Sequence, residues 1–224
     1  FPQADDDTII PYHLVENAIH RDVEGDDDLP SVWGLDVSRF GNDKTALCKR
    51  QGSIVTEIRS WSGLDLMQTV GRVVAEYESL LPSKRPREIL VDSIGLGSGV
   101  VDRLRELELP VRGINVAEAP SMGATYLNLR SELWFKAKGW FEDRACKLPK
   151  DDQLLAELTG IRYSFTSSGK MKAESKDEMR KRGLASPDLA DALCLTMASD
   201  AATALSGAFS SWKGEIKRNL RGIA

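Results

Sequence analysis

The 224-residue sequence predicts an α/β fold in which helices flank a mixed β-sheet. Three short apolar runs follow one another between residues 32 and 61 and are joined by tight polar turns, as in an antiparallel meander. Two further apolar runs, at residues 87–92 and 111–116, each follow a segment with helical spacing of its apolar residues. Strands that are separated by helices pair in parallel, so both orientations are expected in one sheet.

The same patterns predict the individual elements. Strands are expected at residues 32–37, 45–49, 54–61, 87–92 and 111–116. Apolar residues that recur every three or four positions predict helices at residues 66–81, 100–107, 127–140, 151–158 and 187–198. Residues 161–165 and 170–173 flank a Thr-Ser-Ser-Gly turn and predict an added β-hairpin. Pro187 suits the first turn of the last helix, where its missing N–H costs nothing.

Charge is distributed unevenly along the chain. Residues 1–28 contain nine acids and one base, so the rest of the chain carries a net charge of +4 although the whole chain carries −4. We expect residues 1–30 to form an acidic leader or linker with a short helix capped by Asp5–Asp7. Residues 31–200 are expected to form the folded domain, and residues 201–224 a flexible basic tail. The first residue is Phe1 rather than Met, which points to a fragment of a longer protein.

Several functional classes find no support in the sequence. No apolar run approaches the length of a membrane span, and no signal peptide opens the chain. The three cysteines lack metal or redox spacing and are expected to be buried free thiols. The phosphate-binding motif of P-loop proteins is absent. Both histidines precede the predicted domain, which argues against a Ser–His or Cys–His catalyst.

Three acidic segments far apart in the chain are the most informative motifs. Asp36 and Asp92 each end an apolar strand, while Asp188 and Asp191 share one face at the start of the last helix. A carboxylate at the tip of a buried strand is poorly solvated and needs a partner such as a metal ion. Several such carboxylates would repel one another unless cations lay between them. The pattern predicts a magnesium-dependent site that cleaves phosphodiester bonds.

Structural roles remain open for some of these residues. The structural alternative for Asp36 is a cap on the turn at residues 39–41, and the functional interpretation is favoured over it. The helix dipole alone explains one acid of the last helix, but hardly two. Asp43 is either structural within its turn or close enough to reach the acidic site. The glycines after Asp92 do not match the dinucleotide-binding fingerprint, and room for a phosphate or a tight turn explains them.

Basic residues precede the third acidic segment. Residues 162–182 contain seven bases and three acids, and the bases include Lys170, Lys172, Lys176 and Arg180. Bases beside a carboxylate cluster suit a polyanionic substrate such as DNA, with its phosphates contacted by the basic side chains. A solvated charged helix explains the same residues equally well, and both interpretations remain open.

Four segments together resemble a known family. Residues 33–36 (WGLD), 41–46 (GNDKTA), 91–97 (VDSIGLG) and 183–193 (GLASPDLADAL) resemble the C-terminal nuclease domain of the large terminase subunits of tailed bacteriophages. The resemblance covers about residues 32–198 and implies an RNase H-like fold. It also implies metal-dependent cutting of concatemeric double-stranded viral DNA during genome packaging.

The resemblance assigns roles to individual residues. Asp36 and Asp92 match the first two acids of the family, and Asp188 best matches the third, with Asp191 as an alternative or helper. These acids would hold two Mg²⁺ or Mn²⁺ ions. Lys172 and Lys176 resemble the family's basic positions.

The resemblance also implies partners and a location. They are an N-terminal packaging ATPase domain of the same full-length protein, the terminase small subunit and the capsid portal, in the host cell cytoplasm and without a membrane. Two alternatives remain: another RNase H-like nuclease such as a junction resolvase, and a non-catalytic module that docks to DNA or to the portal.

Overall fold

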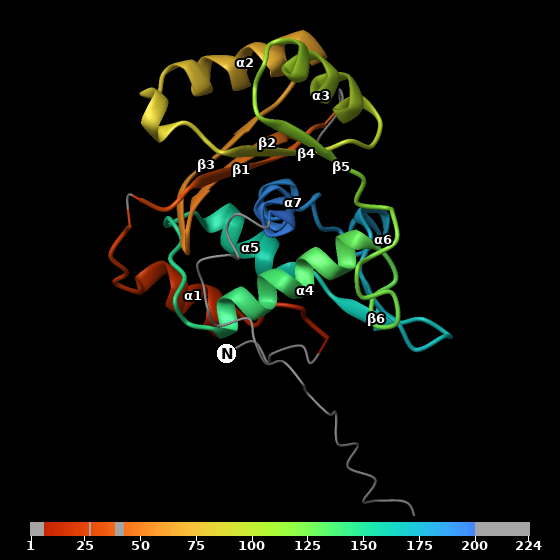
Figure 1. Cartoon of the computed structure of the whole chain (residues 1–224). Helices are drawn as coiled ribbons and strands as arrows, with labels where there is room; N and C mark the ends of the chain where they lie inside the picture. The colour runs from red at the N-terminus through yellow and green to blue at the C-terminus, as the bar shows by residue number, and fades with distance from the viewer. Residues whose placement is uncertain (1–6, 27, 39–42, 200–224) are drawn as a thin grey trace, which may run out of the picture.

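A five-stranded sheet forms the centre of the computed structural model, which describes residues 7–26, 28–38 and 43–199 (Figure 1). The strand order is β3-β2-β1-β4-β5. The first three strands form an antiparallel meander, and β4 and β5 extend the sheet in parallel with β1. The strands are β1 (Ser31–Asp36), β2 (Thr45–Gln51), β3 (Ile54–Trp61), β4 (Glu88–Asp92) and β5 (Val111–Ile114).

Helices cover both faces of this sheet, as Figure 1 shows. The helices on one face are α2 (Leu66–Glu78) and α3 (Leu96–Glu106). Those on the other face are α1 (Tyr12–His20), α4 (Leu129–Glu142), α5 (Asp152–Gly160) and α7 (Asp188–Leu195). The remaining elements are the hairpin of β6 (Tyr163–Phe165) and β7 (Met171–Ala173), helix α6 (Lys176–Lys181) and the single turns η1 (Pro82–Lys84) and η2 (Thr196–Ala198).

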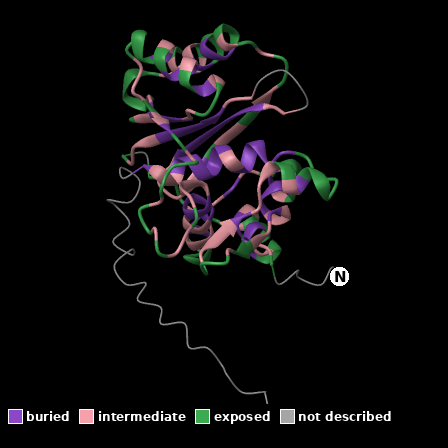
Figure 2. Ribbon diagram, turned by 90° about the vertical axis from the view of Figure 1, so that its right-hand side faces the viewer, coloured by how far each residue is buried: buried purple, intermediate pink, exposed green. Residues whose placement is uncertain are grey.

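The alternation of side chains along the strands divides the core into two layers. Trp33 and Leu35 of β1 pack under α2 and α3 with the apolar residues of those helices. Val32, on the opposite face of β1, packs in the layer that contains α7, α4, α5 and α1. Figure 2 shows buried residues along the strands and on the helix beside them. Asp36 lies on the same face of β1 as Val32, which is the face that α7 covers.

Gly34 allows α7 to approach β1 closely. A Cβ atom at this position would lie 2.0 Å from the backbone carbonyl oxygen of Ala192, which belongs to α7. No side chain fits there, so glycine is required by the contact between helix and strand. The contact brings the helix that begins with Asp188 against the strand that ends with Asp36.

The predicted mixed sheet, its flanking helices and its added hairpin are confirmed. The helix predicted at residues 100–107 begins earlier, at Leu96, so Gly97 and Gly99 lie within its first turn. A Cβ atom on Gly97 would lie 1.6 Å from the carbonyl oxygen of Asp92, so this glycine lets α3 begin directly over the end of β4. All three cysteines are buried and free, as expected.

The described part of residues 1–30 differs from the expected leader or linker. Ile9, Ile10 and Val15 are fully buried in the layer beneath the sheet, and the Ile9 N–H donates to the Ile161 carbonyl oxygen at 3.1 Å. Helix α1 begins after Pro11 and has no side-chain cap, so Asp7 does not cap it. The sequence prediction followed the many acids of this segment and not its short apolar pattern. Burial of the apolar residues is what fixes the segment in the fold.

Some predicted features lie outside the described residues. They include Asp5 and Asp6, most of the turn at residues 40–43, and the tail at residues 201–224. In the part of the chain that the structure describes, no helix is both long enough and apolar enough to cross a membrane.

The contact at Gly34 can be tested by adding one methyl group. Gly34→Ala is expected to lower the free energy of unfolding by about 2–3 kcal/mol or more, because backbone must move to accommodate the Cβ atom. Gly71→Ala in α2 is the matched control, since no heavy atom lies within 4 Å of its added Cβ. It should be neutral or raise stability by up to about 1 kcal/mol. Urea denaturation measures the free energy of unfolding of both variants, and equal effects of the two substitutions would contradict the assigned contact.

Candidate functional site

Two acids lie side by side at the carboxyl edge of the sheet. Strands β1 and β4 are parallel and Leu35 pairs with Val91, so the next residues, Asp36 and Asp92, end neighbouring strands at the same level. Asp36 is only 5% exposed. The Asp92 carboxylate is half-buried and accepts the Ile94 N–H at 3.1 Å. Both side chains line one pocket of about 360 Å³.

Helix α7 supplies two further acids to this edge. Asp188, 3% exposed, accepts the Ser186 hydroxyl at 2.6 Å through Oδ1 and the Lys44 N–H at 2.7 Å through Oδ2. Asp191 lies one turn further along the helix and lines the same pocket as Asp36. The helix thus presents both carboxylates toward the ends of β1 and β4.

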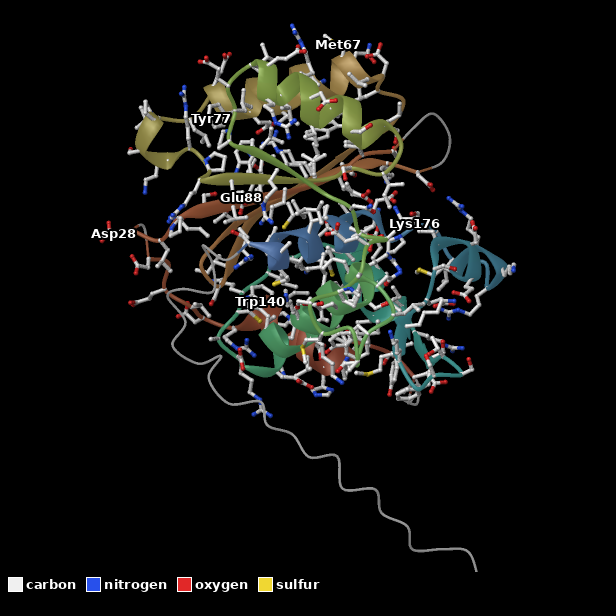
Figure 3. All side chains as sticks on the ribbon, turned by 45° about the vertical axis from the view of Figure 1, so that its right-hand side comes forward. Asp28, Met67, Tyr77, Glu88, Trp140 and Lys176 are labelled. Carbon is white, nitrogen blue, oxygen red and sulfur yellow. The ribbon has the colours of Figure 1, made fainter. Side chains whose placement is uncertain are left out.

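Lys176 lies between these carboxylates. Its Nζ is 2.9 Å from Asp36 Oδ2, 3.2 Å from Asp188 Oδ1 and 3.7 Å from Asp191 Oδ2. Lys176 is the first residue of α6, whose start is fixed by a capping box between Ser175 and Glu178. Figure 3 shows Lys176 where α6 meets the ends of the strands. One ammonium group therefore joins acids from two separate segments of the chain.

Asp191 is held mainly by α4. Its carboxylate accepts the Trp134 indole N–H at 2.8 Å and lies 3.0 Å from Nη2 of Arg130. The Arg130 guanidinium also lies over the Trp134 ring and donates to the Glu174 carbonyl oxygen at 2.6 Å. Arg130 and Trp134 of α4 therefore fix the orientation of the Asp191 carboxylate.

Burial makes the cluster electrostatically unusual. The pKa of Asp36 is raised to about 7: burial is the largest cause, Lys176 lowers the pKa, and nearby Asp191 and Asp188 raise it. Burial also raises the pKa of Asp92. For Lys176, burial lowers the pKa but the surrounding carboxylates outweigh it, so the pKa of its ammonium lies above the ordinary value. The four acids Asp36, Asp92, Asp188 and Asp191 outnumber the two bases that contact the cluster, Lys176 and Arg130, so an excess of negative charge remains that only a proton or another cation can offset.

The donor atoms of this cluster fit a hard divalent cation. Carboxylate oxygens are the ligands that Mg²⁺, Mn²⁺ and Ca²⁺ prefer. Among the described residues, no three acidic, histidine or cysteine side chains already surround one point as ligands. Here the Lys176 ammonium lies among the carboxylates instead. The residues therefore suit such a cation chemically, and Lys176 would have to move away for one to bind.

The other predicted site residues lie in or around the pocket. Lys172 lines the pocket and pairs with Glu178 at 2.7 Å. Arg180 pairs with Asp43 at 2.6 Å, so the Asp43 carboxylate contacts a base and not the acidic cluster. Lys170 directly precedes the second hairpin strand, outside the residues that line the pocket.

Sequence reasoning missed three residues that shape the site. Arg130 and Trp134 lie on an amphipathic helix and Glu157 on α5, where nothing in the sequence distinguishes them from ordinary surface or core residues. Each acts through contacts across the fold, which no local pattern shows. Burial raises the pKa of Glu157 to about 7.

The sheet order and its flanking helices define an RNase H-like fold. No protein-family model and no curated protein matches the chain. Among solved structures, the nuclease domain of the large terminase subunit gp2 of bacterial virus Sf6 is similar, with 22% sequence identity and a TM-score of 0.72, over 86% of this chain and 99% of that chain.

Two nucleases from other phages are also similar. The large terminase nuclease from thermophilic phage G20c with bound magnesium is 16% identical, with a TM-score of 0.63, over 86% of this chain and 97% of that chain. The Thermus phage P74-26 large terminase nuclease domain is 15% identical, with a TM-score of 0.60, over 84% and 93%. Other structures hold manganese or calcium in a mutant Sf6 domain and cobalt in the G20c nuclease. These similarities confirm the fold that the sequence resemblance implies.

The raised pKa of Asp36 predicts how stability depends on pH. The pKa of this carboxyl rises from 3.8 in the unfolded chain to about 7 in the folded chain, so its contribution to the free energy of unfolding is fully present below pH 3.8. This contribution is lost as the pH rises toward 7 and amounts to at most about 4 kcal/mol. In EDTA, the free energy of unfolding should therefore fall more steeply between pH 4 and pH 7 for the wild type than for Asp36→Asn. Denaturant titrations at several pH values measure both slopes, and parallel slopes would contradict the assignment.

Removal of the Lys176 ammonium should favour divalent cations. Lys176→Met is expected to lower the melting temperature in EDTA, because buried carboxylates lose their partner. It should also lower the Kd for Mn²⁺, measured by calorimetry, since no ammonium then competes for the same oxygens. Lys170→Met is the matched control and should change neither quantity. A weaker affinity for Mn²⁺ in Lys176→Met would show that the ammonium does not compete with the metal.

Proposed function

We propose that this protein is a metal-dependent endonuclease that cuts concatemeric double-stranded viral DNA during genome packaging. One observation carries the proposal: Lys176 contacts acids from β1 and α7, at the edge where β4 contributes Asp92 beside Asp36. Buried carboxylates with an excess of negative charge are what a site for divalent cations requires. The fold supports the proposal, because the similar solved structures are phage terminase nucleases.

Asp36, Asp92 and Asp188 are the residues that would hold two Mg²⁺ or Mn²⁺ ions. The chemistry that such a pair supplies is activation of an attacking water and neutralisation of the departing 3′ oxygen. Asp36 ends the strand beside Asp92 and shares the Lys176 ammonium with Asp188, so it would act together with both of the other acids. Asp191 would contribute by fixing Arg130, which lines the same pocket.

Basic residues around the pocket would bind the DNA backbone. Lys172 and Lys176 line the pocket with Asp36, Asp92 and Asp191. Lys170 directly precedes β7, and Arg180 lies on α6. Ammonium and guanidinium groups neutralise phosphates and set the register of a duplex without reading its sequence. Lys176, once released from Asp36 and Asp188, would be free to contact a phosphate beside the scissile bond.

The proposal extends to the setting in which the nuclease acts. As part of a terminase, it would work with an N-terminal packaging ATPase domain, the terminase small subunit and the capsid portal, in the host cell cytoplasm. The substrate in this setting is continuous duplex DNA, so cutting should need no branched structure.

Cleavage of supercoiled plasmid tests the proposal. With Mg²⁺ or Mn²⁺ the wild type should cut the plasmid, and with EDTA it should not. Asp36→Asn and Asp188→Asn should each lower the rate by at least about 100-fold, because several kcal/mol of transition-state stabilisation is lost. Asp143→Asn, on the exposed end of α4, is the matched control and should cut like the wild type.

Three outcomes would contradict the proposal. If Asp36→Asn is folded by circular dichroism and keeps full activity, the assignment of the catalytic site is wrong. Cleavage of four-way junctions but not of plain duplex would favour a junction resolvase. Absence of any Mn²⁺-induced rise in melting temperature would favour a non-catalytic docking module, since a ligand that binds only the folded state must stabilise it.

A further inference from the structure

Helix α7 begins without a cap of its own. Its N-cap residue is Pro187, and no side chain within the helix start accepts a hydrogen bond from the first amides. The first N–H groups of a helix have no partner inside the helix and need one from elsewhere. In α7 these groups belong to the turn that carries Asp188 and Asp191, so whatever binds them also fixes the two acids.

Glu157 of α5 supplies the missing partner. Its Oε2 accepts the Ala190 N–H at 3.0 Å, which is the contact that a capping side chain normally makes. The side chain is only 8% exposed, and no base pairs with it among the described residues. Burial of a carboxyl without a basic partner lowers the free energy of unfolding unless hydrogen bonds compensate for it, which indicates a specific role for Glu157.

A second set of contacts joins Glu157 to the Asp188 carboxylate. Glu157 Oε1 accepts from Nε2 of Gln153 at 2.7 Å, and Gln153 Oε1 accepts from the Lys44 ammonium at 3.1 Å. The N–H of the same Lys44 donates to Asp188 Oδ2 at 2.7 Å. Together these hydrogen bonds form a closed ring that runs from α5 to the residue before β2 and back to α7.

The ring extends away from the pocket that Asp36 and Asp92 line, and Asp188 is the one member of the ring that belongs to the proposed metal site. All four of its side chains, Lys44, Gln153, Glu157 and Asp188, line a separate pocket of about 310 Å³. Asp188 is thus held from this side, while Lys176 binds its other oxygen from the nuclease pocket. Glu157 itself does not line the nuclease pocket.

We propose that Glu157 is a positioning residue for Asp188: it caps α7 from α5 and, through Gln153, fixes the Lys44 segment whose N–H binds the Asp188 carboxylate. The inference deepens the proposed function and rests on it, since it assumes that Asp188 binds a divalent cation. Residues that orient metal ligands without touching the metal contribute about 10- to 100-fold to metal affinity.

Three substitutions of Glu157 test the inference. Glu157→Ala removes the carboxyl, and Glu157→Asp keeps the charge but withdraws it from the Ala190 N–H. Both should raise the Kd for Mn²⁺, measured by calorimetry, by about 10-fold or more. Glu157→Gln retains an acceptor for the N–H and should restore affinity to within about threefold of the wild type. The matched control is Leu155→Ala on the same helix, which should lower the melting temperature through lost packing but leave the Kd unchanged.

Amide hydrogen exchange in metal-free protein gives a readout that does not depend on nuclease function. Loss of protection at residues 188–191 in Glu157→Ala or Glu157→Asp, together with the weaker Mn²⁺ binding, would support the inference. Unchanged protection, or lost protection with unchanged Mn²⁺ affinity, would overturn it while the proposed function stands. A wild type that binds no Mn²⁺ would overturn the proposed function and with it this inference, whatever the exchange shows.

Discussion

The Lys176 ammonium binds buried carboxylates that belong to β1 and α7, and the geometry of the whole site depends on this ion pairing. Like charges at a poorly solvated strand edge repel one another, and water is not available in sufficient amount to screen them. An internal cation allows the folded protein to hold Asp36 and Asp188 together. The same oxygens suit a divalent cation, so one arrangement explains both how the metal-free fold tolerates its acids and where a metal would bind.

The fold brings these acids together through backbone packing. Parallel pairing of β1 with β4 makes Asp36 and Asp92 neighbours, because the carboxyl ends of parallel strands meet at one edge. The third acid reaches that edge only because Gly34 lets α7 lie directly against β1. Gly97 has the equivalent role at the other helix, where it lets α3 begin over Asp92. Gly34 and Gly97, each near an acidic motif, thus provide close approach between elements.

Around the acids lies a second group of residues that fix their orientation. Arg130 and Trp134 of α4 hold Asp191, and Glu157 of α5 binds the first turn of α7. Each of these helices packs in the layer beneath the sheet, where α1 also contributes apolar residues. The layer that forms the largest part of the core is therefore also the support of the site, and the described part of the N-terminal segment belongs to it.

The sequence alone determined the element types and the mixed sheet, because apolar periodicity and tight turns are local signals. It also indicated Asp36, Asp92, Asp188 and Asp191 as one group, since each acid follows or opens an apolar element. Only the tertiary structure decided that Lys176 lies among them, that Arg130 pairs with Asp191, and that the apolar residues between positions 9 and 18 pack in the core. Those facts depend on contacts between residues distant along the chain, and such contacts leave no periodic trace in the sequence.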